Sequence, residues 1–417
     1  MKLKSIFFEQ GKADGIYQLQ APGCAAALLS WADERGALEE WTSFAYIPLD
    51  AFGRGSFRFQ GGRAIPAEAG YIHVKAVADD LMHWEEMLFP IPDIPEAVSA
   101  GQKIRFYAMS DLHLSLKPGL LKAVLSHIKE MFSQMDAASA LLLAGDMTND
   151  GIKQQYELLK ECLLPVLSRM PVLPVIGNHD MPQIPLESRN RHEIYNYALF
   201  QEWIFEKMKE SVSDDKRKTL MEECTMGPDG AYAVSMGSVE IIGLQAVADQ
   251  RRFVFEEGRQ LEWLDRHLSL HQDMCWHLVL CHAPLIYHNP KREYDKNNPY
   301  LNRDKQLQKI LDSHKRVIFL SGHTHLSMDN PKGCVEWDEK HENVYINDAS
   351  IRPTDLLPGE AMQPAEWKNG TFLDITICEN EVEIVTRSAK DGKKHARGYY
   401  RISAPDLKCS HNTGGEF

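Results

Sequence analysis

The chain has 417 residues, with a hydrophobic fraction of 44%, a charged fraction of 25% and a formal net charge of -13 at pH 7. These values are typical of a globular protein of two or three domains, or of one large domain with additions. The acidic balance argues against non-specific binding of nucleic acid, which needs a basic surface. No apolar run approaches the ~20 residues that span a bilayer, so no membrane partner is expected.

The N-terminus and the cysteines favour a cytoplasmic location. Residues 1–9 lack the apolar core of a signal peptide. The eight cysteines are scattered and include no CxxC pair, a pattern typical of reduced, mostly buried thiols. The sequence leaves a disulfide pairing open.

Residues 1–98 predict a small β-rich domain that resembles a β-sandwich. Short apolar or alternating runs are separated by Gly, Pro and Asp; they are Ser5–Phe8, Ala25–Leu29, Phe44–Pro48, Ser56–Phe59 and Tyr71–Val77. The proline-rich stretch from Pro90 to Pro95 indicates a linker. We expect this domain to serve packing or to bind a protein partner.

From Lys103 the pattern becomes an alternation of strands and helices. The apolar runs Ile104–Met109, Ala140–Ala144 and Val172–Ile176 predict buried strands. Helical spacing between them, over 121–132 and 156–166, predicts the connecting helices. This alternation favours a parallel or mixed sheet, whose polar loops gather at the carboxyl ends of the strands, where ligands bind.

The second domain is predicted to cover 99–390. Residues 184–225 are charged and predict a helical cap insertion beside the site. The strand pattern then resumes with two hairpins, two single strands and a helix that starts at Leu261; the strands are Tyr232–Val234, Val239–Leu244, Leu278–Leu280, Val317–Leu320, Phe372–Ile377 and Val382–Val385. Residues 391–417 are expected to form a C-terminal tail.

Polar motifs stand at the ends of the first two buried strands. Asp111-Leu112-His113 places two metal-binding side chains two residues apart, and in extended backbone such positions point the same way. Gly145-Asp146 adds a carboxylate, whose two oxygens can bridge two ions. Each motif alone is more often an ordinary turn than a metal site.

The third strand ends at Gly177-Asn178-His179-Asp180. Glycine permits a tight turn there, and Asn178 offers a neutral oxygen. His179 can act as an acid if it is not a ligand, and Asp180 can orient it.

Three histidines follow the later strands. His282 follows Leu278–Leu280, and Gly322-His323-Thr324-His325 follows Val317–Leu320. A lone histidine is usually a core residue, but five loops with oxygen or imidazole ligands, each just after a strand, predict one two-metal site. Two close metal ions can catalyse the cleavage of phosphate esters.

The ordered set DxH, GD, GNHD, H, GHxH resembles that of the calcineurin-like metallophosphoesterases, over about 103–390. The resemblance implies a four-layer α/β/β/α sandwich after the N-terminal domain. It implies that a hydroxide bridging two metals attacks phosphorus, and that His179, with Asp180 behind it, protonates the leaving group. It also implies two ligand sets that share Asp146, of which one is Asp111, His113, Asp146 and His325 and the other is Asp146, Asn178, His282 and His323.

Nitrogen and oxygen ligands suit two divalent transition-metal ions, Mn, Fe or Zn. Purple acid phosphatases carry an iron-binding tyrosine at the position of Asn149, so the resemblance argues against a ferric centre here. The segment 258–264 is similar to the family's GxQxxWL, whereas Gln245 stands where the family often has Asp or Asn.

The resemblance implies hydrolysis of a small phosphodiester, with a cyclic nucleotide as one option, or of a phosphomonoester. The alternatives are a nuclease, which the acidic charge disfavours, and a non-catalytic scaffold, which the complete ligand set disfavours. Candidates for substrate contact are Asn149, Arg191, His192, Tyr287 and His288.

Overall fold

The chain divides into two compact units in a computed structural model. One unit comprises Met1–Ser99 with Tyr399–Ile402, and the other comprises Ala100–Gly398 with Ser403–Phe417. The structure describes residues 7–10, 16–33, 36–37, 45–58, 71–78, 83–90, 103–181, 195–210, 224–249, 252–271, 274–289, 300–325, 334–348, 350–351 and 370–403.

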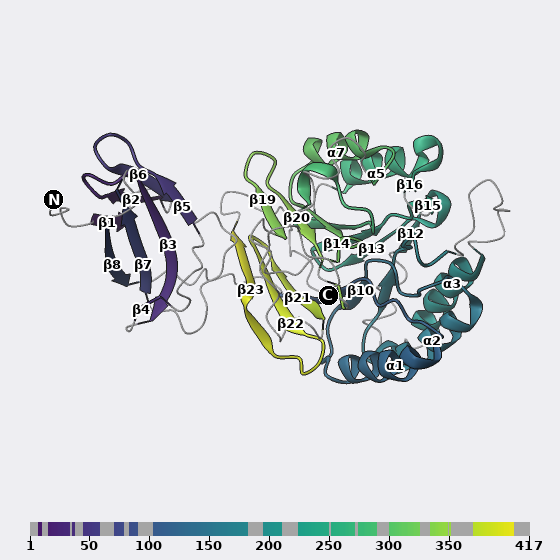
Figure 1. Cartoon of the computed structure of the whole chain (residues 1–417). Coiled ribbons are helices and arrows are strands. Elements are labelled where there is room, and N and C mark those ends of the chain that lie inside the picture. Colours follow the sequence, from purple (N-terminus) through teal and green to yellow (C-terminus); the bar gives the residue numbers. More distant parts are fainter. Residues whose placement is uncertain are drawn as a thin grey trace, which may run out of the picture. The chain divides into compact units, whose positions relative to one another are not determined.

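The N-terminal unit contains two antiparallel sheets (Figure 1). The first has three strands in the order β1 (Phe7–Gln10), β2 (Ile16–Gln20) and β6 (Arg54–Arg58). The second has five strands, with β5 paired to β3; they are β4 (Gly36–Ala37), β3 (Ala26–Asp33), β7 (Tyr71–Val77), β8 (Trp84–Pro90) and β5 (Ala45–Pro48).

One apolar core joins these two sheets. Burial alternates along β7, so one face of the second sheet points inward. Leu19 of the first sheet lies in the same buried cluster as Leu29 and Val74 of the second. The predicted β-rich N-terminal region is therefore confirmed. The expected linker lies outside the described residues, apart from Pro90 at the end of β8.

A six-stranded mixed sheet belongs to the second unit, apart from residues 399–402 of its last strand. Its order is β11-β10-β9-β21-β22-β23, in which β9, β10 and β11 are parallel and β21 is antiparallel to β9 and β22. The strands are β9 (Ile104–Met109), β10 (Ala140–Leu143), β11 (Val172–Pro174), β21 (Thr371–Cys378), β22 (Glu381–Ser388) and β23 (Lys394–Ser403).

The second unit also contains a seven-stranded sheet, in the order β12-β13-β14-β17-β18-β20-β19. Its four central strands, β14, β17, β18 and β20, are parallel and fully buried. The strands are β12 (Cys224–Met226), β13 (Tyr232–Met236), β14 (Val239–Gly243), β17 (Trp276–Leu280), β18 (Val317–Ser321), β19 (Val335–Asp338) and β20 (Asn343–Asn347). A separate ribbon pairs β15 (Val247–Asp249) with β16 (Arg252–Val254).

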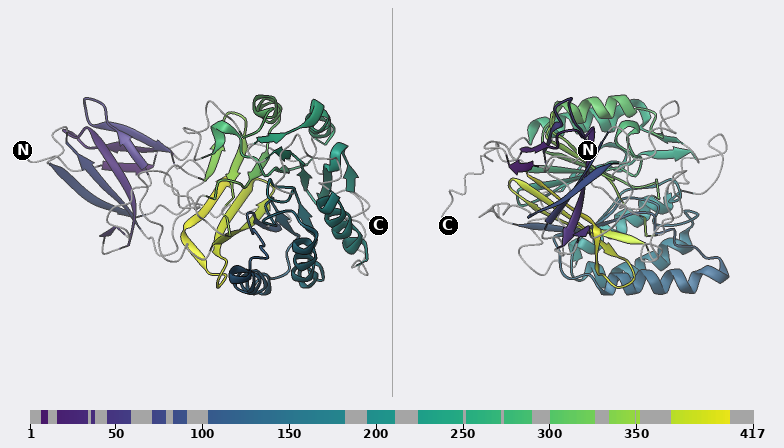
Figure 2. Two further views of the ribbon diagram at one scale, coloured as in Figure 1. Left: turned by 45° about the vertical axis from the view of Figure 1, so that its right-hand side comes forward. Right: turned by 60° about the vertical axis from the view of Figure 1, so that its left-hand side comes forward.

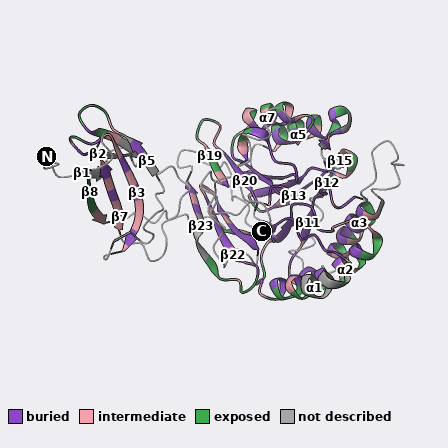
Figure 3. Cartoon of the chain, viewed as in Figure 1, coloured by how far each residue is buried: buried purple, intermediate pink, exposed green. Residues whose placement is uncertain are grey.

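Two groups of helices lie on opposite sides of these sheets (Figures 1 and 2). One group contains α1 (Pro118–Ser133) and α2 (Lys153–Leu167), with α3 (Tyr195–Glu210) in contact with α2. The other contains α5 (Arg259–Leu270) and α7 (Asp304–Ser313). Figure 3 shows buried strands and helices with exposed outer faces, as expected of parallel strands covered on both sides. The mixed α/β class is confirmed, and the detailed four-layer order stays a prediction.

Three expectations need correction or restriction. The predicted tail from 391 contains β23, because its backbone pairs at the edge of the six-stranded sheet. Of the predicted cap, only α3 and residues 224–225 lie among the described residues. Six described cysteines are thiols, as expected, whereas Cys275 is disulfide-bonded, a pairing that the sequence had left open. Within the described ranges, no helix is long and apolar enough to cross a membrane.

Candidate active site

The carboxyl ends of strands from both sheets meet at the candidate site. Asp111, Asp146 and Asn178 follow the adjacent parallel strands β9, β10 and β11. His282 and His323 follow β17 and β18 of the other sheet. The His323 backbone N–H donates to Asp111 Oδ2 at 3.2 Å, which joins the loops of the two sheets.

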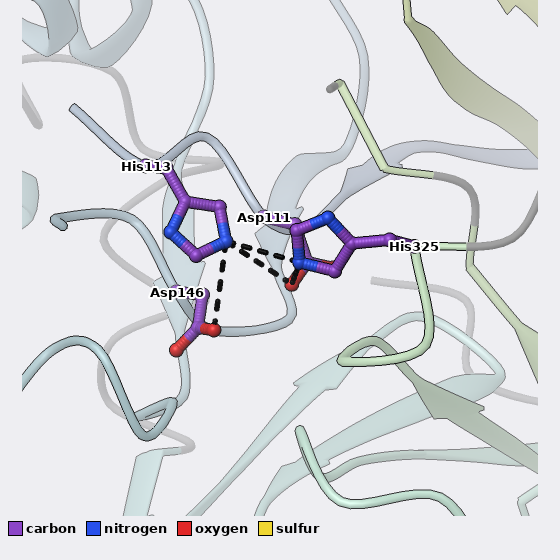
Figure 4. A group of neighbouring side chains, drawn as sticks. All are labelled: Asp111, His113, Asp146 and His325. Atoms are coloured by element: carbon purple, nitrogen blue, oxygen red, sulfur yellow. Dashed lines mark hydrogen bonds and ion pairs between the residues drawn. The ribbon is translucent and has the colours of Figure 1, made fainter. Parts of the chain in front are cut away.

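Four side chains form a first cluster (Figure 4). His325 Nε2 lies 3.1 Å from Asp111 Oδ1 and 3.0 Å from His113 Nε2. His113 Nε2 lies 3.7 Å from Asp146 Oδ2. These are Asp111, His113, Asp146 and His325, the set that the resemblance assigns to one ion.

A second cluster shares one member with the first. Asp146, His282 and His323 offer ligand atoms within 4.8 Å of one another, and His282 Nε2 lies 3.3 Å from Asp146 Oδ2. His323 Nδ1 lies 3.0 Å from Asn178 Oδ1, which brings the fourth predicted ligand to this cluster. Asp146 therefore stands between the two ligand sets.

Two buried atoms in these clusters fit a bound cation. His282 Nδ1 lies 2.6 Å from the Ala144 carbonyl oxygen, which can only accept a hydrogen bond. The ring therefore carries a proton on Nδ1 and directs Nε2, its other nitrogen, toward Asp146. Among the described residues, His282 Nε2 and Asp111 Oδ1 face an ionisable atom at 3.3 and 3.1 Å but make no hydrogen bond of good geometry. Buried polar atoms without partners are costly, and coordination would satisfy both.

The ligand loops run through left-handed backbone. Positive φ values occur at five predicted ligands, namely Asp111 (55°), His113 (45°), Asp146 (51°), His323 (72°) and His325 (54°). This conformation is unfavourable for residues other than glycine and typical of functional sites. The expectation that extended backbone aligns Asp111 with His113 is therefore wrong, because left-handed turns bring these side chains together.

At two glycines of the motifs, neighbouring atoms leave no room for a Cβ atom. At Gly145, which has a φ of 90°, a Cβ atom would lie 2.5 Å from His282 Nδ1. At Gly177, a Cβ atom would lie 2.2 Å from Asp146 Oδ1. Both glycines allow backbone to approach a ligand side chain more closely than any other residue could.

At four of five ligand residues the electrostatics favour the protonation state that binds a cation, and His282 is the exception. Burial lowers the pKa of His113 to about 4, and burial with the charge of His282 lowers that of His323 to about 3. The histidines hold the pKa values of Asp111 and Asp146 well below their usual range, against burial. The two carboxylates outweigh burial and raise the pKa of His282 to about 9, so metal and proton compete for its Nε2.

His179 lies beside the first cluster and does not belong to either ligand set. Its ring centroid is 4.6 Å from that of His113. Its Nδ1 lies 2.9 Å from the Asn149 carbonyl oxygen, and its backbone N–H donates to Asp146 Oδ1 at 2.7 Å. The loop after β10 therefore fixes the ring through its Nδ1 atom.

Asp180 does not orient the His179 ring as predicted. Its Oδ1 accepts hydrogen bonds from the backbone N–H and the hydroxyl of Thr148, at 2.9 and 3.1 Å. Its Oδ2 accepts the Gly177 N–H at 2.9 Å. Burial and the charge of Asp146 raise the pKa of Asp180 to about 7, against these hydrogen bonds. Asp180 therefore braces the backbone of two ligand loops.

The residues predicted to contact the substrate have different surroundings in the structure. The Asn149 side chain donates to Asp150 Oδ1 at 2.9 Å, while its carbonyl holds His179. His288 stacks on Tyr345 at 3.6 Å between ring centroids and pairs with Glu336 at 3.2 Å, contacts that tie it to β19 and β20. Tyr287 is exposed. The remaining two candidates, Arg191 and His192, lie outside the described residues.

The sequence did not predict several residues that contact the proposed metal ligands. Ser110 donates its hydroxyl to Asp111 Oδ2. The rings of Phe253 and Tyr300 meet that of His323 edge-on, at centroid distances of 5.1 and 4.5 Å. The position of Ser110 just before a motif is the one signal that sequence offers. Phe253 lies on β16 and Tyr300 lies in a loop, and only the fold brings them to the site.

In the segment 258–264, the side chain of Gln260 makes two hydrogen bonds with the backbone of Gln245. Its Oε1 accepts the Gln245 N–H and its Nε2 donates to the Gln245 carbonyl, both at 2.8 Å. Gln245 Oε1 in turn accepts the Ile176 N–H at 2.9 Å. This chain of contacts fixes the end of β14 against the loop that carries Asn178.

A carboxylate shared by two sets of nitrogen and oxygen ligands is an arrangement that enzymes with two metal ions use to cleave phosphate esters. A sequence model described as calcineurin-like phosphoesterase matches residues 104–327. The chain therefore belongs to the calcineurin-like phosphoesterase family and is a metal-dependent phosphoric ester hydrolase.

Solved structures that are similar to this chain include the following three. Purple acid phosphatase PPD1 from yellow lupin (Lupinus luteus) is 13% identical, with a TM-score of 0.49 over 95% of this chain and 74% of that one. GAP50 of Plasmodium is 14% identical, with a TM-score of 0.41 over 74% and 90%. A predicted phosphoesterase from Streptococcus pneumoniae TIGR4 is 13% identical, with a TM-score of 0.33 over 73% and 99%. No curated protein matches the chain.

Proposed function

We propose that the chain hydrolyses a small phosphate ester at a dinuclear metal site. The proposed substrate is a phosphodiester, with a cyclic nucleotide as one option, or a phosphomonoester. The observation that carries this proposal is the sharing of Asp146 by two ligand clusters, with His179 beside them. The formal net charge of -13 supports a small substrate over a nucleic acid, because a polyanion would be repelled from most of the chain. Binding of a protein partner by the N-terminal unit stays a prediction.

The two ligand sets would hold two divalent ions of Mn, Fe or Zn, because all their donors are nitrogen or oxygen. Asp111, His113 and His325 would complete one set, and Asn178, His282 and His323 the other, with Asp146 in both. Bound together, two such ions supply a water-derived nucleophile and stabilise the charge that develops on phosphate.

In this proposal, His179 donates a proton to the leaving group. A hydrogen bond to the Asn149 carbonyl retains the proton on Nδ1. The proton on Nε2 is then the one that the imidazolium ring can give up. An alkoxide is a poor leaving group, so a proton delivered to its oxygen as the P–O bond breaks lowers the barrier.

The experiment uses purified full-length protein, Mn²⁺, bis-p-nitrophenyl phosphate and p-nitrophenyl phosphate. We expect turnover of at least one substrate, loss on chelation and recovery when Mn²⁺ is restored. Asp146→Asn is the matched inactive variant. Absence of turnover for both substrates, in protein that contains metal, would overturn the proposal. Strong, salt-dependent binding of single-stranded DNA would instead favour a nuclease.

A further inference from the structure

We propose that Glu240, His267 and His271 form a second, separate site for a divalent transition-metal ion such as Zn²⁺, with His277 orienting Glu240. This site goes beyond the proposed phosphoesterase function and does not depend on it. Its ligands are one carboxylate and two imidazoles, a donor set that suits Zn²⁺. An ion bound there would join the end of α5 to the seven-stranded sheet.

The fold brings these residues together from three elements. Glu240 lies on β14 and His277 on the neighbouring parallel strand β17, and the two are paired in register. His267 lies in the last turn of α5, and His271 caps the same helix four residues later. Residues four apart occupy one face of a helix, so both rings reach Glu240.

The site lies at the opposite end of the sheet from the catalytic ligands. His277 is the second residue of β17, and His282 follows the end of the same strand. Five residues of extended chain span roughly 16 Å at ~3.3 Å a residue. A metal ion bound at Glu240 would therefore be independent of the dinuclear centre.

The interatomic distances suit a single ion. Glu240 Oε1 lies 2.8 Å from His267 Nε2 and 3.3 Å from His271 Nδ1, and these three ligand atoms lie within 4.8 Å of one another. Donors about 2.0–2.1 Å from one tetrahedral zinc ion are roughly 3.3 Å apart. The catalytic cluster has the same spacing, since His282 Nε2 lies 3.3 Å from Asp146 Oδ2.

Burial and charge also favour a cation. Glu240 is 1% exposed, and in the part of the chain that the structure describes its ion-pair partners are histidines, with no Lys or Arg among them. His277 Nδ1 lies 3.0 Å from the other carboxylate oxygen, Oε2, which fixes the carboxylate so that Oε1 faces the helix. The His271 side chain is 36% exposed and leaves the ion a path from solvent.

The test counts the metal ions bound to the full-length protein. Wild type, His271→Ala and His314→Ala are equilibrated with Zn²⁺, freed of excess metal and measured by elemental analysis. His314 is the matched control, because it also caps a helix, α7, and pairs with one carboxylate, Asp265, at 2.9 Å. We expect His271→Ala to hold one equivalent fewer than the other two proteins, with unchanged phosphoesterase turnover.

Cobalt gives a second readout. Co²⁺ in the site is expected to give visible absorption that His271→Ala lacks and His314→Ala retains. Glu240→Gln, which keeps the size of the side chain, should also lose one equivalent. Equal metal content in wild type and His271→Ala, with equal cobalt spectra, would overturn the proposal and leave a hydrogen-bonded carboxylate–histidine cluster. Because the counts do not depend on turnover, failure of the phosphoesterase proposal would be seen separately.

Discussion

The Nδ1 atom of His179 lies 2.9 Å from the backbone carbonyl oxygen of Asn149. The ring is therefore oriented by main chain that follows β10, the strand that also leads to Asp146. One loop thus carries both the residue shared by the two ligand clusters and the group that positions the proposed acid. A side-chain substitution at Asn149 leaves this contact in place.

Replacing His179 should separate acid catalysis from metal binding. We expect His179→Ala to retain metal and to lower kcat by about 10²–10⁴ for substrates with alkoxide leaving groups. The loss should be much smaller for p-nitrophenyl esters, which need little protonation. Asn149→Ala is the control and should change kcat little, because its carbonyl remains. Equal losses of kcat for good and poor leaving groups would contradict the acid role.

Asp146→Asn tests the shared ligand. An amide keeps the size of the side chain but removes the charge that faces both His113 and His282. We expect both ions to bind more weakly and activity to be lost, as measured by elemental analysis and by turnover at saturating Mn²⁺. Full activity with two tightly bound ions would rule out a bridging role.

Gly145→Ala tests the close approach of backbone to His282. The new Cβ atom would lie 2.5 Å from the His282 ring, so the ring must move and metal affinity should fall. The matched control is Gly392→Ala, which also has a positive φ (67°) but whose nearest neighbour, at 3.0 Å, is the end of the Gln134 side chain. Both variants should lose about 1–2 kcal/mol of stability from the left-handed backbone. Only Gly145→Ala should lose metal, and equal metal content in the two variants would contradict the steric argument.

Asp180→Asn tests the brace between the ligand loops. An asparagine would direct its NH₂ group at Thr148 or Gly177, whose N–H groups are themselves donors. We expect a loss of about 1–3 kcal/mol in the free energy of unfolding, measured in urea. A variant as stable as wild type would show that these hydrogen bonds contribute little.

Stability should depend on pH through Glu240. Against burial, hydrogen bonds from His267 and His277 lower the pKa of Glu240 from 4.5 to about 2. Between these values the unfolded chain binds more protons, so the contribution of Glu240 is complete above about pH 4.5 and is lost as pH falls toward 2. The shift corresponds to about 3 kcal/mol.

The measurement is urea unfolding of chelator-treated protein from pH 2 to 6. Other carboxyl groups titrate in the same range, so the difference between wild type and Glu240→Gln isolates this one. We expect that difference to shrink as pH falls. A difference that stays constant across the range would show that the pKa of Glu240 is not lowered.

Local sequence was enough to predict most strands, because apolar runs bounded by turn residues can be recognised without knowledge of their partners. Ile104–Met109 is observed as predicted, and the predicted strand Val317–Leu320 is observed as Val317–Ser321. The sequence did not predict nine of the observed strands, whose short or mixed runs become strands by pairing with neighbours. They are β2, β4, β8, β12, β15, β16, β19, β20 and β23.

The sequence by itself determined the chemistry of the centre. The residue types at Asp111, Asp146, His282 and the other motif positions restrict the ligands to oxygen and imidazole, whatever the geometry. Tertiary structure decided the roles around them. Asp180 is next to His179 in sequence, yet its carboxylate turns to Thr148 and Gly177, because buried N–H groups need acceptors. The carbonyls of Ala144 and Asn149 bind the histidine rings, and a backbone carbonyl has no signature in sequence because every residue carries one.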